Sequence, residues 1–329
     1  MKNIYVQDGE LSRKDHTIKL VKEGKLTWVP IKKIKEVNCF GGCTLTNEFL
    51  DLTREHQIAV HLFSWYGRPI GTFHHQRPNK NGKVLKAQLK LMERDGVILA
   101  KKTIKTLRLN MLKYLDQYRK KGNEASKKAY QAIKGLDNRL EEAQKTEEIM
   151  GVEGITWQYF YTFLKTLYTE YNFNERNKQP PKDPVNALIS FLNTLLYNRI
   201  ETEFSRTDIY TEISYLHSSD QKRNSLVLDI AELYKIDITY RLISYILRKR
   251  MINKDDFLEI DGMCTLSPEA RKIVITEYER YMQKTFSHPI LKRRITLENS
   301  IKLEAFKLIR AALEDKTYEP ICIGALKLE

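Results

Sequence analysis

Residues 74–83 read HHQRPNKNGK, a polar stretch with no apolar periodicity that separates two differently patterned parts of the chain. Before it, short runs of β-branched and aromatic residues recur; after it, apolar residues return every three or four positions. The first pattern is typical of strands and the second of helices. We therefore predict an α+β protein. A small N-terminal β domain would span residues 1–80, residues 81–83 would end the linker, and a larger all-α domain would span residues 84–329.

The strand signal of the first part is divided by turn residues. Gly9, Gly24 and Gly67 punctuate it, and one helix is expected at about residues 47–56. The expected strands are residues 4–6, 17–21, 26–29, 34–37, 58–63 and 69–73.

The helical signal of the second part is clearest in one apolar stripe, formed by Ile104, Leu107, Met111, Leu115 and Tyr118. Gly96 and Gly122 are expected to stop this helix at its two ends. Residues 257–266 contain Asp261-Gly262 and predict a small hairpin. Further helices are expected at residues 124–149, 153–174, 184–203, 208–217, 225–250, 268–285 and 296–314.

The composition favours a polyanionic partner. The chain has 56 Lys and Arg residues against 42 Asp and Glu residues, which leaves a net charge of +14. Such an excess is common in proteins that bind nucleic acid, because each neutralised phosphate releases counterions. No apolar run approaches the roughly 20 residues that span a bilayer. We therefore expect no membrane association and a cytoplasmic location.

Three segments contain the candidate catalytic chemistry. Glu153 lies between glycines in GVEG, at the expected start of a helix, where it would sit on an exposed turn. His217 ends a short expected helix before a polar loop. Asp229 and Glu232 are three residues apart on an apolar helix, so both project from one face.

Two acids on an apolar stripe repel each other and lose hydration unless a cation compensates. Oxygen ligands with one imidazole suit magnesium or manganese better than zinc. Two simpler interpretations stay open on the residues alone. A lone histidine at a helix end often caps or packs the helix, and acids three apart often lie on a solvated face.

A basic stripe lies on the face opposite the apolar one. Lys101, Lys105 and Arg108 step by four and three, which predicts a phosphate-binding track. A solvated helix face would show the same spacing.

Five motifs follow one another along the chain: FGGCTLT (40–46) with IAVHLF (58–63), GVEG (151–154), PPKDPVNALIS (180–190), LH (216–217) with SLVLDIAE (225–232), and YEP (318–320). Together they resemble the motifs of the CRISPR-associated integrase family. The departures are modest: residues 213–215 read ISY where many members carry a Gly-Phe pair, and Glu232 stands where others have Asp.

The resemblance implies a metal-dependent DNA endonuclease and integrase. Such an enzyme inserts captured DNA fragments into the CRISPR array by transesterification with a DNA 3′-hydroxyl. Its catalytic metal ligands would be Glu153, His217 and Glu232, with Asp229 as support or as an additional ligand, and its cofactor magnesium or manganese. The DNA contacts that we expect are Lys101, Lys105, Arg108, Lys222, Arg223 and Asn186.

The resemblance also implies partners: DNA, a second copy of the chain bound through the β domains, and a small companion adaptation protein that completes a heterohexamer. Two rival functions fit the same residues. One is a general metal-dependent nuclease acting on branched DNA or RNA, and the other is a noncatalytic nucleic-acid scaffold.

Overall fold

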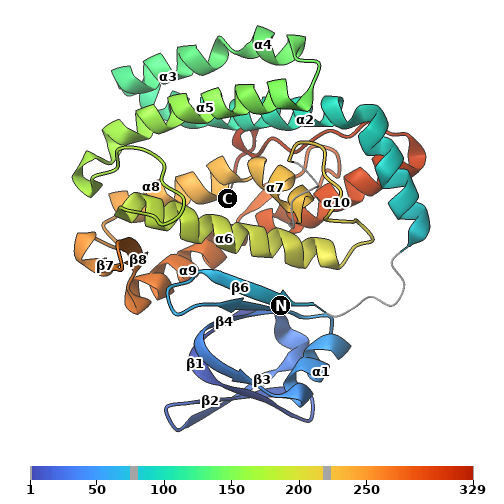
Figure 1. Cartoon of the computed structure of the whole chain (residues 1–329), viewed down its shortest axis with the longest axis vertical. Helices are drawn as coiled ribbons and strands as arrows, with labels where there is room; N and C mark the ends of the chain where they lie inside the picture. Colours follow the sequence, from blue (N-terminus) through green and yellow to red (C-terminus); the bar gives the residue numbers. More distant parts are fainter. Residues whose placement is uncertain (1, 75–80, 218–223, 329) are drawn as a thin grey trace. The chain divides into compact units, whose positions relative to one another are not determined.

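The computed structural model describes residues 2–74, 81–217 and 224–328. The chain divides into two compact units, Met1–Lys80 and Asn81–Glu329. The first unit is built on a six-stranded sheet and the second is mainly helical (Figure 1). The α+β class predicted from the sequence is confirmed.

The sheet of the first unit is mixed, with strand order β3-β2-β1-β4-β5-β6. β1 and β5 each pair in parallel with β4, and the other neighbours are antiparallel. Helix α1 (Asn47–Glu55) begins where the Thr46 side chain accepts a hydrogen bond from the Phe49 amide. All six expected strands are present: β1 (Lys2–Lys14), β2 (Thr17–Lys22), β3 (Lys25–Pro30), β4 (Ile34–Leu45), β5 (Ala59–Phe63) and β6 (Pro69–Phe73), with a 3₁₀ turn η1 (Ile31–Lys33).

The glycine pair of the FGGC motif has a structural role in this sheet. Gly41 has φ +74°, and a Cβ there would overlap a carboxylate oxygen of Asp8. The amide of Gly42 donates to that oxygen at 2.7 Å. The β1–β4 register shifts between Gln7 and Gly9, so the glycine pair accommodates a bulge.

The second unit is organised around the long helix α2 (Gly82–Arg119). α2 packs against α3, α5 and α10, and α6 packs against α7 and α10 (Figure 1). The other helices are α3 (Glu124–Lys134), α4 (Asp137–Glu142), α5 (Thr146–Leu167), α6 (Pro184–Ser205), α7 (Ser225–Glu232), α8 (Arg241–Arg248), α9 (Pro268–Met282) and α10 (Leu297–Glu314).

Short elements connect these helices. The predicted hairpin is confirmed as β7 (Phe257–Ile260) with β8 (Met263–Leu266), whereas the two-stranded sheet of β9 (Thr285–Ser287) and β10 (Arg294–Thr296) was not foreseen. The remaining elements are the 3₁₀ turns η2 (Thr169–Tyr171), η4 (Lys254–Asp256) and η5 (Ile323–Ala325) and the π turn η3 (Ile236–Tyr240).

Several expected helix boundaries were wrong. Gly96 does not stop α2, since it lies between buried Leu91 and Leu99, whose packing outweighs the roughly 1 kcal/mol that a helical glycine costs. The helix expected at 124–149 is three pieces, because the chain breaks at Gly135 and again before Thr146. The helix expected at 225–250 is interrupted by η3, and the one expected at 208–217 is absent.

The exposed position expected for Arg108 was also wrong. Its side chain is buried on α2, where the guanidinium donates to the carbonyl of Ile133 at 2.6 Å and pairs with Asp137 at 2.8 Å. α3 and α4 fold back over this face of α2. Lys101 donates to the carbonyl of Glu141, and Lys105 pairs with its carboxylate at 2.9 Å. The stripe therefore ties α2 to the segment that covers it.

We expect Arg108→Ala to lower the free energy of unfolding by about 2–4 kcal/mol, because it removes buried volume and leaves the Ile133 carbonyl without its donor. Lys105→Ala, which breaks only a surface ion pair, should cost less than about 1 kcal/mol. Urea unfolding of both variants measures the difference. Equal costs would show that the Arg108 contacts contribute no more than a surface pair.

Candidate metal centre and active site

Glu153 lies inside helix α5, not on a turn at its start. The helix begins at Thr146, and the carboxylate of Glu148 accepts the backbone amides of Gln144 and Lys145 there. The GVEG motif is thus the second turn of α5. The exposed position expected for Glu153 was wrong: the side chain is partly buried and faces His217 and Glu232.

His217 ends an irregular segment that follows α6. Gln88 of α2 holds this segment, because its side chain accepts the amide of Tyr210 and donates to the carbonyls of Tyr210 and Ile213 at 2.8 and 3.1 Å. Two of these bonds occupy the carbonyls of Tyr210 and Ile213, which a helix over these residues would use for its own hydrogen bonds. They explain why residues 208–217 form turns rather than the expected helix.

Asp229 orients the histidine. It is buried on α7, and its oxygens accept the backbone amides of Tyr215, Leu216 and His217 at 2.9–3.1 Å. The ring Nδ1 of His217 lies 2.7 Å from Asp229 Oδ1. Both carboxylate oxygens are occupied, and Nε2 is left as the ring nitrogen for a cation. Of the two roles expected for Asp229, the contacts favour support.

Three ligand atoms converge beside this pair. One from each of Glu153, His217 and Glu232 lies within 4.8 Å of the others. Glu232 is buried; its Oε1 pairs with Lys235, while its Oε2 has no hydrogen-bond partner among the described residues. A buried carboxylate oxygen without a donor is costly. The donor set, two carboxylates and one imidazole, fits a hard divalent cation.

The pKa shifts of Glu153 and His217 also indicate that the cluster favours an added positive charge. Burial, followed by repulsion from Glu232, raises the pKa of Glu153 to about 7. Burial lowers the pKa of His217, but the hydrogen bond and charge of Asp229 and the charges of Glu232 and Glu153 raise it overall. Without a cation, the cluster therefore binds protons near neutral pH.

Lys235 is a site residue that the sequence reasoning missed. Its Nζ pairs with Glu232 and lies 5.8 and 5.7 Å from the ring centres of Trp157 and Tyr197. Burial lowers the pKa of Lys235, but the charge of Glu232 above all raises it, so the side chain stays cationic. The available signal was its spacing of three from Glu232, which places both on one helix face.

The Asn186 side chain is fully buried, and its polar atoms form hydrogen bonds to other residues of the chain. Its amide oxygen accepts from Arg176 Nη1 at 2.7 Å and from the Asn177 amide at 3.0 Å, and its Nδ2 donates to the Glu175 carbonyl at 2.8 Å. The expectation that Asn186 contacts DNA was wrong, since the side chain is already saturated. Lys222 and Arg223 lie outside the described residues.

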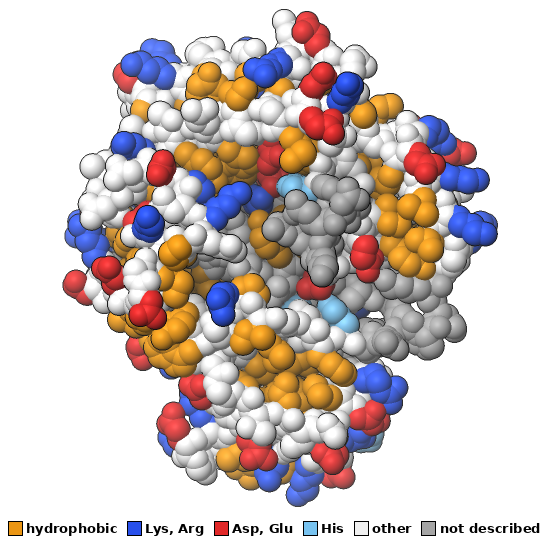
Figure 2. Space-filling view, in the orientation of Figure 1, with side chains coloured by type: hydrophobic (Ala, Val, Ile, Leu, Met, Phe, Trp, Pro, Cys, Tyr) orange, Lys and Arg blue, Asp and Glu red, His pale blue; other side chains and the backbone are white. Residues whose placement is uncertain are grey.

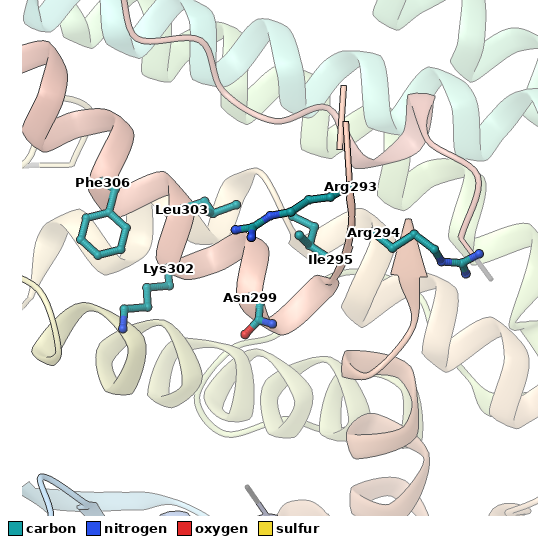
Figure 3. A pocket seen from close by; sticks show the side chains of 7 residues that line it. All are labelled: Arg293, Arg294, Ile295, Asn299, Lys302, Leu303 and Phe306. Carbon is teal, nitrogen blue, oxygen red and sulfur yellow. The ribbon is translucent and has the colours of Figure 1, made fainter. Parts of the chain in front are cut away.

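A surface hollow of about 320 Å³, lined by none of the metal-cluster residues, is basic and aromatic rather than acidic (Figure 3). Lys302 Nζ lies 5.8 Å from the ring centre of Phe306, which is 43% exposed. The hollow has no carboxylate, so it is a different kind of surface from the metal cluster. Its lining is Arg293, Arg294, Ile295, Asn299, Lys302, Leu303 and Phe306.

Comparisons with known proteins show the family of this chain. A sequence model of the family described as CRISPR associated protein Cas1 matches residues 4–280. The chain belongs to this family. It is 34% identical to a CRISPR-associated endonuclease Cas1 of Clostridium perfringens over 321 residues, which cover 95% of this chain and 96% of that protein. The recognition made from the motifs is confirmed.

Solved structures share the fold. A Cas1 protein from Thermotoga maritima aligns with a TM-score of 0.82 and 27% identity, covering 97% of this chain and 99% of that one. A casposase bound to an integration product aligns with a TM-score of 0.84 and 19% identity over 96% and 92% of the two chains. None of the helices in the described part of the chain has the length and hydropathy to cross a bilayer.

We expect Glu153→Gln to stabilise the metal-free protein increasingly as pH rises. The folded-state pKa of about 7 lies above the ordinary 4.5, so the carboxyl costs stability progressively between these values and costs it fully above pH 7. The advantage of the variant should grow by roughly 2–3 kcal/mol from pH 4.5 to pH 8. Unfolding in chelator measures it, with exposed Glu147→Gln as the matched control. A pH-independent difference would contradict the shifted carboxyl.

We expect Asp229→Asn to weaken Mn²⁺ binding by about 10- to 100-fold, because the new amide nitrogen cannot accept the backbone amides and the ring of His217 loses its orientation. Calorimetric titration with Mn²⁺ gives the affinity. Exposed Asp255→Asn is the control. Wild-type affinity in a folded Asp229→Asn protein would show that Asp229 does not position the histidine.

Proposed function

We propose that this protein is a metal-dependent DNA endonuclease and integrase that joins captured DNA fragments to a CRISPR array through their 3′-hydroxyls. The observation that supports this most directly is the cluster of Glu153, His217 and Glu232, whose ligand atoms lie within 4.8 Å in a chain of the Cas1 family. Magnesium or manganese is the proposed cofactor. An enzyme that acts on a genomic array works in the cytoplasm, which is the location that we propose.

The chain's own residues would prepare this site for transesterification. A bound divalent ion would polarise the scissile phosphate and lower the pKa of the attacking hydroxyl. Asp229 fixes the ring of His217 with Nε2 available. Lys235 pairs with Glu232 and keeps a fixed positive charge beside the cluster. Such preorganised charge stabilises the negative charge that develops on phosphoryl oxygens.

Partners follow from the same family membership. We propose that DNA is the substrate, that two copies associate through their β domains, and that a small companion adaptation protein joins two such dimers in a heterohexamer. Hydrophobic side chains gather on part of the surface of the β unit (Figure 2). Its exposed large hydrophobic residues are Leu26, Trp28, Trp65, Tyr66 and Ile70. Exposed apolar area of this kind is typical of protein interfaces.

We expect His217→Ala to reduce strand transfer by at least about 100-fold, since loss of an ion contributing several kcal/mol to the transition state has that effect. DNA affinity and the folded circular dichroism spectrum should stay unchanged. Chelator should abolish the wild-type reaction, and Mn²⁺ or Mg²⁺ should restore it. A half-site integration assay with labelled fragments measures these outcomes, with exposed His16→Ala as the control.

The same assay separates the rival functions by their products. Joined strands indicate an integrase, whereas cleavage of branched DNA or RNA without joining would replace this proposal with a general nuclease. Tight DNA binding with neither product, in the presence of Mn²⁺, would leave a noncatalytic scaffold.

A further inference from the structure

A basic groove lies along the first turns of α2, apart from the stripe that the sequence had suggested. The groove has a volume of about 670 Å³. Three exposed lysines line it: Lys83, Lys86 and Lys90. The other charged lining residues are Arg94 and Asp315, which form an ion pair with 2.6 Å between Nη1 and Oδ1. The rest of the lining is small or apolar: Gly82, Ala87, Leu91 and Ala312.

The three lysines have no carboxylate partner in the part of the chain that the structure describes. Within residues 81–217 and 224–328, no carboxylate lies within ion-pair distance of Lys83, Lys86 or Lys90. Lys101 and Lys105, further along the same helix, are both engaged with Glu141. The unpaired lysine set therefore differs from Lys101 and Lys105 on the same helix.

The geometry of these lysines matches a sugar-phosphate backbone. Spacings of three and four place them on one helix face, and seven residues of rise span about 10 Å. One strand of a DNA duplex presents about three phosphates over that length. Gly82, Ala87 and Ala312 are small, so a backbone can approach the groove closely.

The lining also decides between duplex and single-stranded ligands. Unpaired bases bind to aromatic side chains on which they stack, and this groove has none. The hollow in Figure 3 has such a ring in Phe306, but it lacks a row of unpaired lysines. Contacts to phosphate alone carry no sequence information. The ligand indicated by the groove is a DNA duplex bound without regard to its sequence.

We propose that Lys83, Lys86 and Lys90 bind the phosphate backbone of duplex DNA, one phosphate per lysine, and hold the substrate of the integrase proposed above. These lysines act on affinity and take no part in the chemistry. The inference rests on the proposed function, yet it is measured by binding alone.

The test compares two alanine variants of the full chain. Affinity for a fluorescent DNA duplex is measured in chelator between about 50 and 200 mM salt. Three lost contacts should flatten the slope of log affinity against log salt by about 0.9 each, or roughly 2.7 in total, in the Lys83→Ala, Lys86→Ala, Lys90→Ala protein. Lys101→Ala with Lys105→Ala should leave the slope unchanged, since both lysines already have partners.

Control measurements distinguish the loss of phosphate contacts from unfolding or loss of the metal site. The corresponding triple Arg variant should retain the wild-type slope, and the triple Ala variant should keep wild-type thermal stability and Mn²⁺ affinity. Its strand transfer should recover at saturating DNA. A wild-type salt slope in a folded triple Ala variant would overturn the proposal. An altered slope together with absent strand transfer in the wild type would support the groove while rejecting the proposed function.

Discussion

The carboxylate of Asp229 is the group on which the geometry of the candidate metal site depends. Its two oxygens accept the backbone amides of Tyr215, Leu216 and His217 and also hold the histidine ring. A buried carboxylate is tolerated only when its lone pairs are satisfied. Helix α7 and the irregular segment before it must therefore form together, and their formation brings His217 beside Glu232.

The segment that Asp229 organises also contacts residues that are distant in the sequence. The hydroxyl oxygens of Tyr215 and of Thr103 on α2 lie 3.0 Å apart, within hydrogen-bond distance. Near the C-terminus, Tyr318 donates to the buried carboxylate of Glu304 at 2.7 Å, and Lys102 donates to the Tyr318 carbonyl. The YEP motif of residues 318–320, far from the metal cluster in sequence, thus ties the C-terminal segment to α2 and α10.

Local pattern was sufficient to predict the fold class, whereas it offered the clustered residues only as one hypothesis, and the family motifs were needed to assign the set of ligands. Strand periodicity changes to helix periodicity at the linker, and Asp229 and Glu232 are two acids on an otherwise mostly apolar helix. The predictions that were wrong concern residues whose structure depends on contacts with distant parts of the chain. The helix expected at 208–217 is displaced by bonds from Gln88, and Arg108 is buried because α3 and α4 return over α2. No window of sequence contains such long-range partners.

The functions that we propose depend on two groups of charged residues, one buried at the metal cluster and one exposed in the groove. Glu153, Glu232 and Lys235 are partly or fully buried, and their charges affect one another strongly enough that burial and repulsion raise the pKa of Glu153 to about 7. A change to one of them alters both stability and chemistry. Lys83, Lys86 and Lys90 are exposed and unpaired within the described chain, so they contribute little to folding. DNA affinity can therefore change through the groove without disturbing the metal ligands.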